Sequence, residues 1–292
     1  MIELPTFITR RFPYRSRFAP TVFGRMHYVD EGEGRPVLLL HGNPTWSFLY
    51  REVMAGLAGG PYRVVAPDLI GLGLSDKPRE LSAHTLRRHG ESLLELVQGL
   101  ELKDVVLVVQ DWGGPIGAWM AARAGGRVTG LVVMNTALLK PERFRTTAFH
   151  RFSHMPVVSD VAFRLFNFPL PVLGRTQGDP SSISGDVARA YAWPLRKVVD
   201  RAAPLALARM VPNGPEHPTV AELTEGDAWA RSFQGPVELV WGVKDPILGR
   251  ALRRHREVFP RARVTETPAG HFLQEEVPEE IVAAIRRVAA AR

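Results

Sequence analysis

The fold is decided by one stretch of sequence, residues 108–117, which reads VVQDWGGPIG. Its apolar start is typical of a buried strand, and its glycines allow a tight turn into a following helix. A side chain at such a turn stands on a strained backbone at the carboxyl end of the strand, which is the layout of a nucleophile elbow. The residue at the turn is Asp111, whose carboxylate can attack carbon without first losing a proton.

The same position also has a plainer interpretation. Aspartate is a favoured N-cap residue, and a helix N-terminus stabilises its charge in either case. Two further positions favour catalysis, because Asp245 and His271 each follow a predicted strand, at 237–241 and 261–266. Open α/β sheets bind ligands at the carboxyl ends of their strands, and nucleophile, acid and histidine occur here in the expected order. We therefore predict Asp111, Asp245 and His271 as the catalytic residues.

The rest of the chain alternates between strand and helix patterns. Buried strands are predicted at 37–40, 63–66, 105–110, 131–134, 237–241 and 261–266, and helices at 46–57, 83–100, 116–124, 248–258 and 279–290. Apolar strands separated by helices indicate an α/β fold, with a mostly parallel sheet covered on both faces. Residues 21–30 alternate in polarity, so we expect one or two antiparallel strands at the edge of the sheet.

One long segment, residues 140–218, has no strand pattern. It carries ten of the 24 prolines and six of the 14 phenylalanines, which predicts short, bent helices with an aromatic face. We interpret it as a helical cap (lid) over a pocket, inserted after the strand that ends near Asn135. The predicted domains are thus a core of residues 1–139 and 219–292 and a cap of residues 140–218.

Composition excludes several classes of protein. The 292 residues are 45% hydrophobic and include no cysteine, so disorder, disulfide frameworks and cysteine nucleophiles are excluded. The longest aliphatic run, residues 105–109, is far shorter than the ~18 residues that span a bilayer. The net charge of +7 comes from scattered arginines, which does not favour nucleic acid as a partner. With no export or lipidation signal, we expect a cytoplasmic protein without a membrane partner.

The loop after the first buried strand supplies a second group of candidates. It reads HGNPTW over residues 41–46, and in this layout it donates one backbone N–H to an oxyanion hole. The two donors would be the N–H groups of Asn43 and Trp112. Their side chains also carry N–H groups, which suit a departing anion such as halide at ~1.5–3 kcal/mol per hydrogen bond. The alternative role of Trp112 is packing in the hydrophobic core. His41 is expected to shape the loop by hydrogen bonding rather than to act as a catalytic base.

At this point the sequence resembles the haloalkane dehalogenases of the α/β-hydrolase superfamily. The resemblance is carried by HGNPTWSFLYR at 41–51, DLIGLGLSDKP at 68–78 and VQDWGGP at 109–115, and it extends over essentially the whole chain. It implies the α/β-hydrolase fold, with Asp111 as nucleophile, His271 as base and Trp112 as first halide donor. It implies no metal and no organic cofactor.

Subfamilies of these enzymes differ in two roles. One places a glutamate acid where this chain has Asn135, so the acid here is Asp245. Another draws its second halide donor from a cap tryptophan, and residues 140–192 contain none, so Asn43 is the better candidate. The pattern looks like a third subfamily, with an Asp–His–Asp triad and an Asn–Trp halide pair.

The implied reaction has two steps. Asp111 displaces halide from a halogenated alkane to form an alkyl ester, and His271, oriented by Asp245, then activates water to release a primary alcohol, halide and a proton. An imidazole with its ordinary pKa near ~6.5 would lose activity below that pH.

Three alternatives remain open. An epoxide hydrolase shares the Asp–His–Asp machinery but uses two cap tyrosines, and the predicted cap holds only Tyr191. A ligand-binding protein on a hydrolase scaffold is a second, since fold does not fix function. A cofactor-independent oxygenase on the same scaffold is a third.

Overall fold

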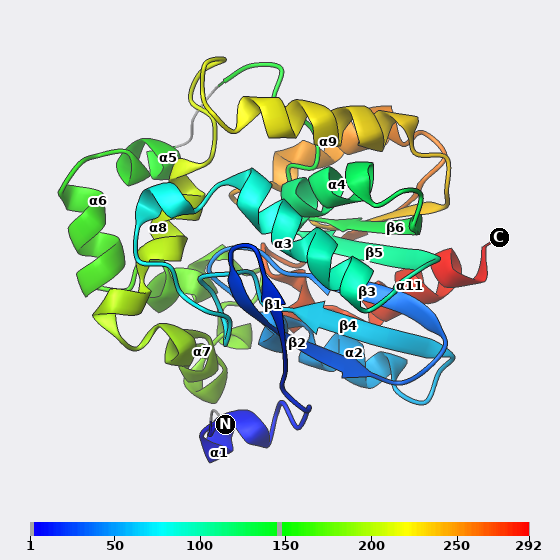
Figure 1. Cartoon of the computed structure of the whole chain (residues 1–292), viewed down its shortest axis with the longest axis horizontal. Coiled ribbons are helices and arrows are strands. Elements are labelled where there is room, and N and C mark those ends of the chain that lie inside the picture. The colour runs from blue at the N-terminus through cyan, green and yellow to red at the C-terminus, as the bar shows by residue number, and fades with distance from the viewer. Residues whose placement is uncertain (1–2, 145–147, 292) are drawn as a thin grey trace.

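The computed structural model describes residues 3–144 and 148–291 and is built around one central sheet (Figure 1). The sheet has eight strands in the order β1-β2-β4-β3-β5-β6-β7-β8. The strands are β1 (Arg17–Thr21), β2 (Gly24–Glu31), β3 (Arg35–Leu40), β4 (Tyr62–Pro67), β5 (Val105–Gln110), β6 (Val128–Met134), β7 (Val237–Gly242) and β8 (Arg263–Thr267). β2, near one edge, pairs antiparallel with both β1 and β4, and all other neighbouring strands pair in parallel, which confirms the predicted fold class.

The pairing of strands places the predicted site residues at one edge of the sheet. Leu40 of β3 lies opposite Val109 of β5, so the loops that follow these two strands meet. Gln110 lies opposite Met134 of β6, which puts the residues after β5 and β6 side by side. β5 is buried along its whole length, as expected for a central parallel strand covered on both faces.

Helices cover both faces of this sheet (Figure 1). They include α2 (Arg51–Leu57), α3 (Leu86–Gly99), α4 (Gly113–Arg123), α9 (Val220–Ser232), α10 (Leu252–Val258) and α11 (Pro278–Ala290). α4 packs against both α3 and α9, while α2 packs against α11. Local signals fix their starts: the Thr85 side chain accepts a hydrogen bond from the N–H of Arg88 at the start of α3, and Pro278 opens α11.

Several predicted boundaries are wrong. The helix predicted at 116–124 begins at Gly113, because the glycines that make the turn also form its first residues. The helix predicted at 46–57 is a short 3₁₀-helix, Ser47–Tyr50, followed by α2. The last strand lies at Arg263–Thr267 rather than 261–266. The sequence interpretation missed α9, whose weak apolar pattern is explained by its place over α4 with one side in solvent.

Between β6 and α9, the described residues form short helices and no strand. They include α5 (Ala148–Ser153), α6 (Val158–Asp160), α7 (Gly185–Ala192) and α8 (Ala202–Arg209), with 3₁₀-helices between them. These helices lie together beside the sheet (Figure 1). Phe163, Leu205 and Ala208 form a small separate core with partly buried phenylalanines around it. The division of the chain into core and cap at 139/140 and 218/219 stays a proposal.

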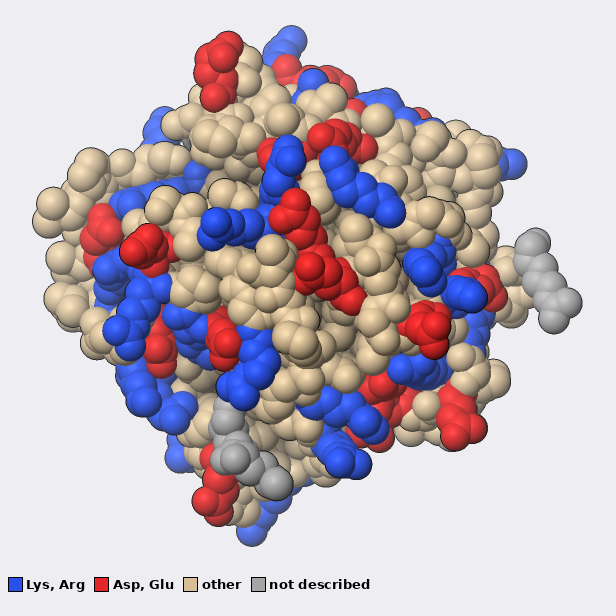
Figure 2. All heavy atoms as spheres, viewed as in Figure 1, with Lys and Arg blue, Asp and Glu red and all other residues tan. Residues whose placement is uncertain are grey.

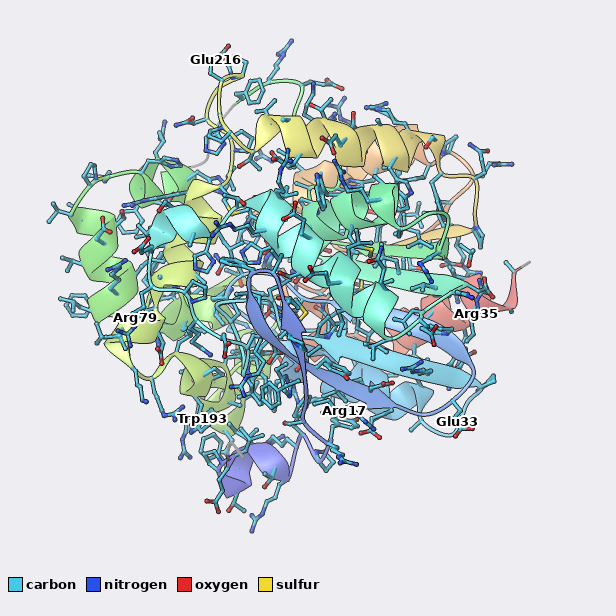
Figure 3. All side chains as sticks on the ribbon, in the orientation of Figure 1. Arg17, Glu33, Arg35, Arg79, Trp193 and Glu216 are labelled. Atoms are coloured by element: carbon cyan, nitrogen blue, oxygen red, sulfur yellow. The ribbon has the colours of Figure 1, made fainter. Side chains whose placement is uncertain are left out.

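The surface shows no basic face in the view of Figure 2, where lysine and arginine alternate with aspartate and glutamate. Opposite charges also pair directly, as in the ion pairs of Arg63 with Asp30 and of Arg123 with Glu225. Arg35, labelled in Figure 3, lies far from the site, at the amino end of β3, where it donates hydrogen bonds to Asp104 and Thr129. Among residues 3–144 and 148–291, no helix has both the length and the apolar character needed to cross a membrane.

Candidate active site

Asp111 stands on a strained turn directly after β5. Its backbone φ is 49°, in the left-handed region that aspartate adopts only occasionally. The turn is held by the N–H of Asp111, which donates to the carbonyl of Asn135 over 3.1 Å, and by its carbonyl, which accepts from Gly114 N–H and the Thr136 hydroxyl. Strain that is fixed from several directions is typical of functional sites.

Glycines bring other chain segments against this turn. A Cβ atom at Gly42 would lie only 2.2 Å from Oδ1 of Asp111, and one at Gly114 would lie 2.0 Å from the Thr136 hydroxyl oxygen. Side chains at these positions would push the loop after β3 and the start of α4 away from the carboxylate. Gly114 of the quoted stretch, and Gly42 of the loop after β3, thus permit this close approach.

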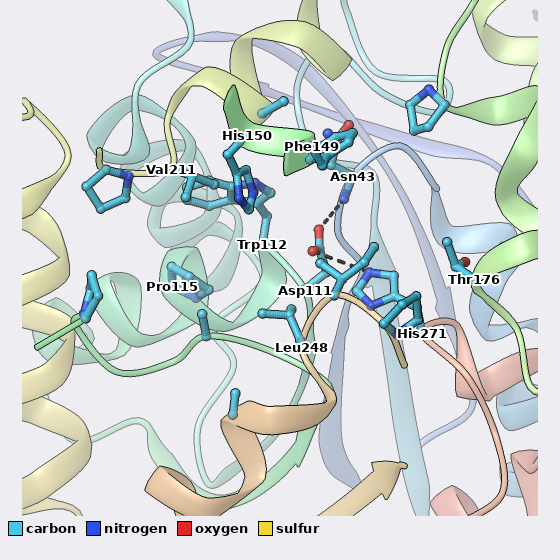
Figure 4. Close-up of a pocket in the computed structure, with 18 of the residues that line it drawn as sticks. Asn43, Asp111, Trp112, Pro115, Phe149, His150, Thr176, Val211, Leu248 and His271 are labelled. Carbon is cyan, nitrogen blue, oxygen red and sulfur yellow. Dashed lines mark hydrogen bonds and ion pairs between the residues drawn. The ribbon is translucent and has the colours of Figure 1, made fainter. Parts of the chain in front are cut away.

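The structure brings the three predicted catalytic residues into one chain of contacts, of which Figure 4 shows the pair Asp111 and His271. Oδ2 of Asp111 lies 3.5 Å from Nε2 of His271, and Nδ1 of His271 lies 2.8 Å from Oδ2 of Asp245. The other carboxylate oxygen of Asp111, Oδ1, accepts a 2.7 Å hydrogen bond from the backbone N–H of Asn43. Asp245 and His271 are buried, whereas the Asp111 side chain keeps 15% exposure.

The pKa of His271 in the free protein departs from the ordinary imidazole value, so the pH limit that holds for an ordinary imidazole does not apply to it. Burial lowers the pKa of His271, but the charges of Asp245 and Asp111 and their hydrogen bonds outweigh burial and raise this pKa to about 10. Burial raises the pKa of Asp245, yet the nearby His271 and the Asn135 amide bring it below its ordinary value. Asp245 therefore stays ionised and favours the protonated imidazole.

Two buried amides support this arrangement and were not predicted as site residues. Asn135 donates to Oδ2 of Asp245 over 2.8 Å and exchanges hydrogen bonds with the backbone of Gly242, which fixes the loop that carries Asp245. Gln110 donates to the carbonyl of His271 over 3.1 Å. Gln110 is the last residue of β5, and Asn135 directly follows β6. This position at the carboxyl end of a central strand is the one sequence signal that could have identified them.

A cavity of about 530 Å³ opens in front of Asp111. Asn43, Asp111, Trp112 and His271 line one end of it (Figure 4). Most of the remaining lining is apolar and includes Pro115, Phe149, Phe168, Val172, Leu173, Val211, Leu223, Ile247 and Leu248. Such a cavity suits a small apolar substrate placed against one carboxylate.

Comparison with known proteins identifies the family. A model of the α/β hydrolase fold matches residues 35–161. A haloalkane dehalogenase of Mycobacterium marinum is 39% identical over 269 residues, covering 88% of this chain and 86% of the relative. Haloalkane dehalogenase 2 of Mycobacterium tuberculosis H37Rv is 36% identical and covers 94% of each chain. The chain belongs to the haloalkane dehalogenase family.

Solved structures agree with this assignment. The crystal structure of a haloalkane dehalogenase from Agrobacterium tumefaciens C58 superposes with a TM-score of 0.82 at 28% identity, covering 94% of this chain and 97% of the other. A tetrameric haloalkane dehalogenase from Paraglaciecola agarilytica NO2 gives 0.80 at 28% identity, covering 98% and 96%. The resemblance and the α/β-hydrolase fold inferred from the sequence are thereby confirmed.

Other polar residues of this dehalogenase have structural partners. The Tyr191 hydroxyl donates to Glu275, away from the cavity, and no tyrosine is among the described residues that line the cavity. His41 donates from Nδ1 to the Gly42 carbonyl, and its Nε2 accepts from Leu69 N–H, so it shapes the loop rather than serving as a base. The described residues contain no group of His, Asp and Glu side chains suited to a metal ion.

Proposed function

We propose that this dehalogenase hydrolyses the carbon–halogen bond of small halogenated alkanes to a primary alcohol, halide and a proton, through a covalent ester on Asp111. The observation that carries the proposal is the asymmetry of the Asp111 carboxylate. Its Oδ1 is held by the N–H of Asn43, while Oδ2 faces Nε2 of His271 at the end of an apolar cavity. Oδ2 is therefore the oxygen placed to attack carbon.

In the first step, Oδ2 of Asp111 forms a bond to the sp³ carbon as the carbon–halogen bond breaks and the electron pair leaves with the halide. A substrate bound in the apolar cavity displaces water from Oδ2, which strengthens the carboxylate as a nucleophile. The ester carbonyl is then Oδ1, already bonded to the N–H of Asn43. That N–H, with the N–H of Trp112, would stabilise the oxyanion of the second step.

The second step requires His271 as a base, and the first step prepares it. Ester formation removes the negative charge of Asp111, which is one of the causes that raise the pKa of His271. The pKa of His271 is therefore expected to fall, and imidazole that has released its proton to solvent can accept another from water. Hydroxide from that water then attacks the ester carbonyl carbon, and the bond between this carbon and Oδ2 breaks. The leaving alkoxide takes the proton of the added hydroxyl and departs as the alcohol, so Asp111 regains its carboxylate with one oxygen from water.

The departing halide would meet the side-chain N–H groups of Trp112 and Asn43. Asn43 already donates from Nδ2 to the carbonyl of Pro204 in α8 over 3.0 Å, which leaves one amide hydrogen for the halide. Its side chain therefore has a structural task as well as the proposed catalytic one. Trp112 offers the cleaner test of halide stabilisation.

Replacing Trp112 by Phe is expected to slow the first step by about 10- to 150-fold, because one hydrogen bond to an anion contributes ~1.5–3 kcal/mol. Rapid-mixing measurement of the first halide released, with bromide and chloride substrates, checks this. Trp229→Phe, a partly buried tryptophan of α9, is the matched control. Equal first-step rates in Trp112→Phe and wild type would show that the indole N–H does not hold the halide.

A halide-release assay over C2–C6 bromo- and chloroalkanes tests the proposed activity, with styrene oxide as a competing substrate class. We expect bromide release with stoichiometric alcohol and no diol from the epoxide, since no described tyrosine lines the cavity to protonate the epoxide oxygen. Diol formation would instead favour the epoxide hydrolase. Saturable binding without any product would favour a ligand-binding protein.

A further inference from the structure

The loop that carries His271 lies beyond the sheet. β8 pairs with β7 as far as Thr267, and residues 268–272 continue past its end. The backbone groups of a buried loop need hydrogen-bond partners from elsewhere. In this protein the partners of the His271 N–H and of both backbone groups of Phe272 include Thr176 and Gln177, in a segment of the predicted cap (residues 176–179) that is almost 100 positions earlier in the sequence.

Residues of this segment bond directly to the backbone beside the imidazole. The N–H of His271 donates to the carbonyl of Thr176 over 2.8 Å. The Gln177 side chain makes two hydrogen bonds to the backbone of Phe272, the residue after His271. Its Oε1 accepts from Phe272 N–H over 2.9 Å, and its Nε2 donates to the Phe272 carbonyl over 3.0 Å. Gln177 is buried, so its amide is not shared with solvent.

Glycines allow the two segments to approach this closely. A Cβ atom at Gly270 would lie 2.2 Å from the carbonyl oxygen of Thr176, and one at Gly178 would lie 2.2 Å from that of Pro268. These neighbours are backbone atoms, which cannot move aside as a flexible side chain can. The close contact between residues 176–179 and the loop of His271 (residues 268–272) therefore depends on glycine in both segments.

A carboxylate joins the same two segments. Glu276 accepts hydrogen bonds from Gly270 N–H over 2.7 Å, from Gly178 N–H over 3.1 Å and from Asp179 N–H over 2.6 Å. It thus links the loop of His271 and the cap segment to each other. On the side of the sheet, Gln110 holds the carbonyl of His271.

We propose that Gln177 is a positioning residue for His271, through which residues 176–179 of the cap set the place of the catalytic base. The inference rests on the role of His271 under the proposed function. Nε2 of the His271 imidazole lies 3.5 Å from Oδ2 of Asp111. A small shift of the Phe272 backbone would therefore change the distance between the imidazole and the ester on Asp111. Only ester hydrolysis uses the imidazole as a base, and the first halide is displaced by Asp111 alone.

Gln177→Met tests this, because methionine keeps the length of the side chain and removes both hydrogen bonds to Phe272. We expect the first bromide from 1-bromobutane to leave at a rate close to wild type. Ester hydrolysis should slow about 10- to 100-fold, as for a catalytic group displaced by a fraction of an ångström to 1 Å. Alkyl-enzyme should then accumulate on Asp111, as measured by rapid-quench mass spectrometry.

The pH profile separates positioning from a general loss of structure. An imidazole that has moved from Asp245 loses part of the interaction that raises its pKa, so the acid limb of ester hydrolysis should shift to lower pH. Gln234→Met, at an exposed glutamine before β7, should change neither step. Gln177→Glu keeps the acceptor for Phe272 N–H, so its rate of ester hydrolysis should lie between those of Gln177→Met and wild type. If Gln177→Met fails to fold, Gln177→Glu still tests whether Gln177 positions His271.

Two results would overturn the inference. One is ester hydrolysis at the wild-type rate in folded Gln177→Met or Gln177→Glu. The other is an equal slowing of both steps with an unmoved acid limb, which would indicate only a structural role. Failure of the proposed function is seen separately, because a His271 variant would then accumulate no ester on Asp111.

Discussion

Replacing Asp111 by Asn is expected to reduce halide release by at least about 10⁴-fold, the scale seen when a catalytic nucleophile is removed. An amide oxygen carries no negative charge and is a poor nucleophile toward sp³ carbon. The substitution preserves the shape of the side chain, and the carbonyl of residue 111 still accepts from Thr136 and Gly114. The loss should therefore come from chemistry rather than from a collapsed turn.

The measurement is bromide release from 1-bromobutane, with circular dichroism and thermal unfolding to show that the variant is folded. Asp186→Asn, at a half-buried aspartate that pairs with Arg189, is the matched control and should keep wild-type turnover. Mass spectrometry must show that the amide introduced at position 111 has not deamidated to aspartate during preparation. Sustained bromide release from a protein verified to carry the amide would remove Asp111 from the role of nucleophile.

The position of the main site residues could be predicted because it depends on local sequence. A buried parallel strand is recognised by its apolar run, and its carboxyl end lies where the next loop begins. Asp111, Asp245 and His271 each follow such a run, so the sheet brings them together whatever the details of the helices. The same argument placed Asn43 opposite Asp111.

The residues that hold this arrangement in place could not be predicted, because their partners are distant in the sequence. Gln177 bonds to Phe272 through space, and no periodicity or motif at either position indicates the other. The raised pKa of His271 likewise depends on two carboxylates whose distances only the folded chain defines. From the sequence, Asn135 shows only that this chain lacks the glutamate that one subfamily has at that position. The structure shows that Asn135 donates a hydrogen bond to Asp245.

Replacing His271 by Gln is expected to trap the alkyl ester. Glutamine can still donate a hydrogen bond toward Asp245, which limits the cost of leaving that buried carboxylate without its partner. It cannot take a proton from water, so hydrolysis of the ester should be slowed by orders of magnitude, while Oδ2 of Asp111 keeps its attack on carbon. The protein should release one bromide per active site and then stop.

Incubation with 1-bromobutane followed by peptide mass spectrometry should locate one butyl group on the peptide that contains Asp111. The double variant with Asp111→Asn should carry none, which distinguishes the ester from alkylation of surface side chains. The His255→Gln variant is the matched control: His255 also lies beside the cavity, but it packs on Trp241 and bonds to the carbonyl of Ala251, so it should turn over without accumulating ester. A folded His271→Gln protein that releases bromide continuously and carries no butyl group would require a reaction in which water, not Asp111, attacks the carbon.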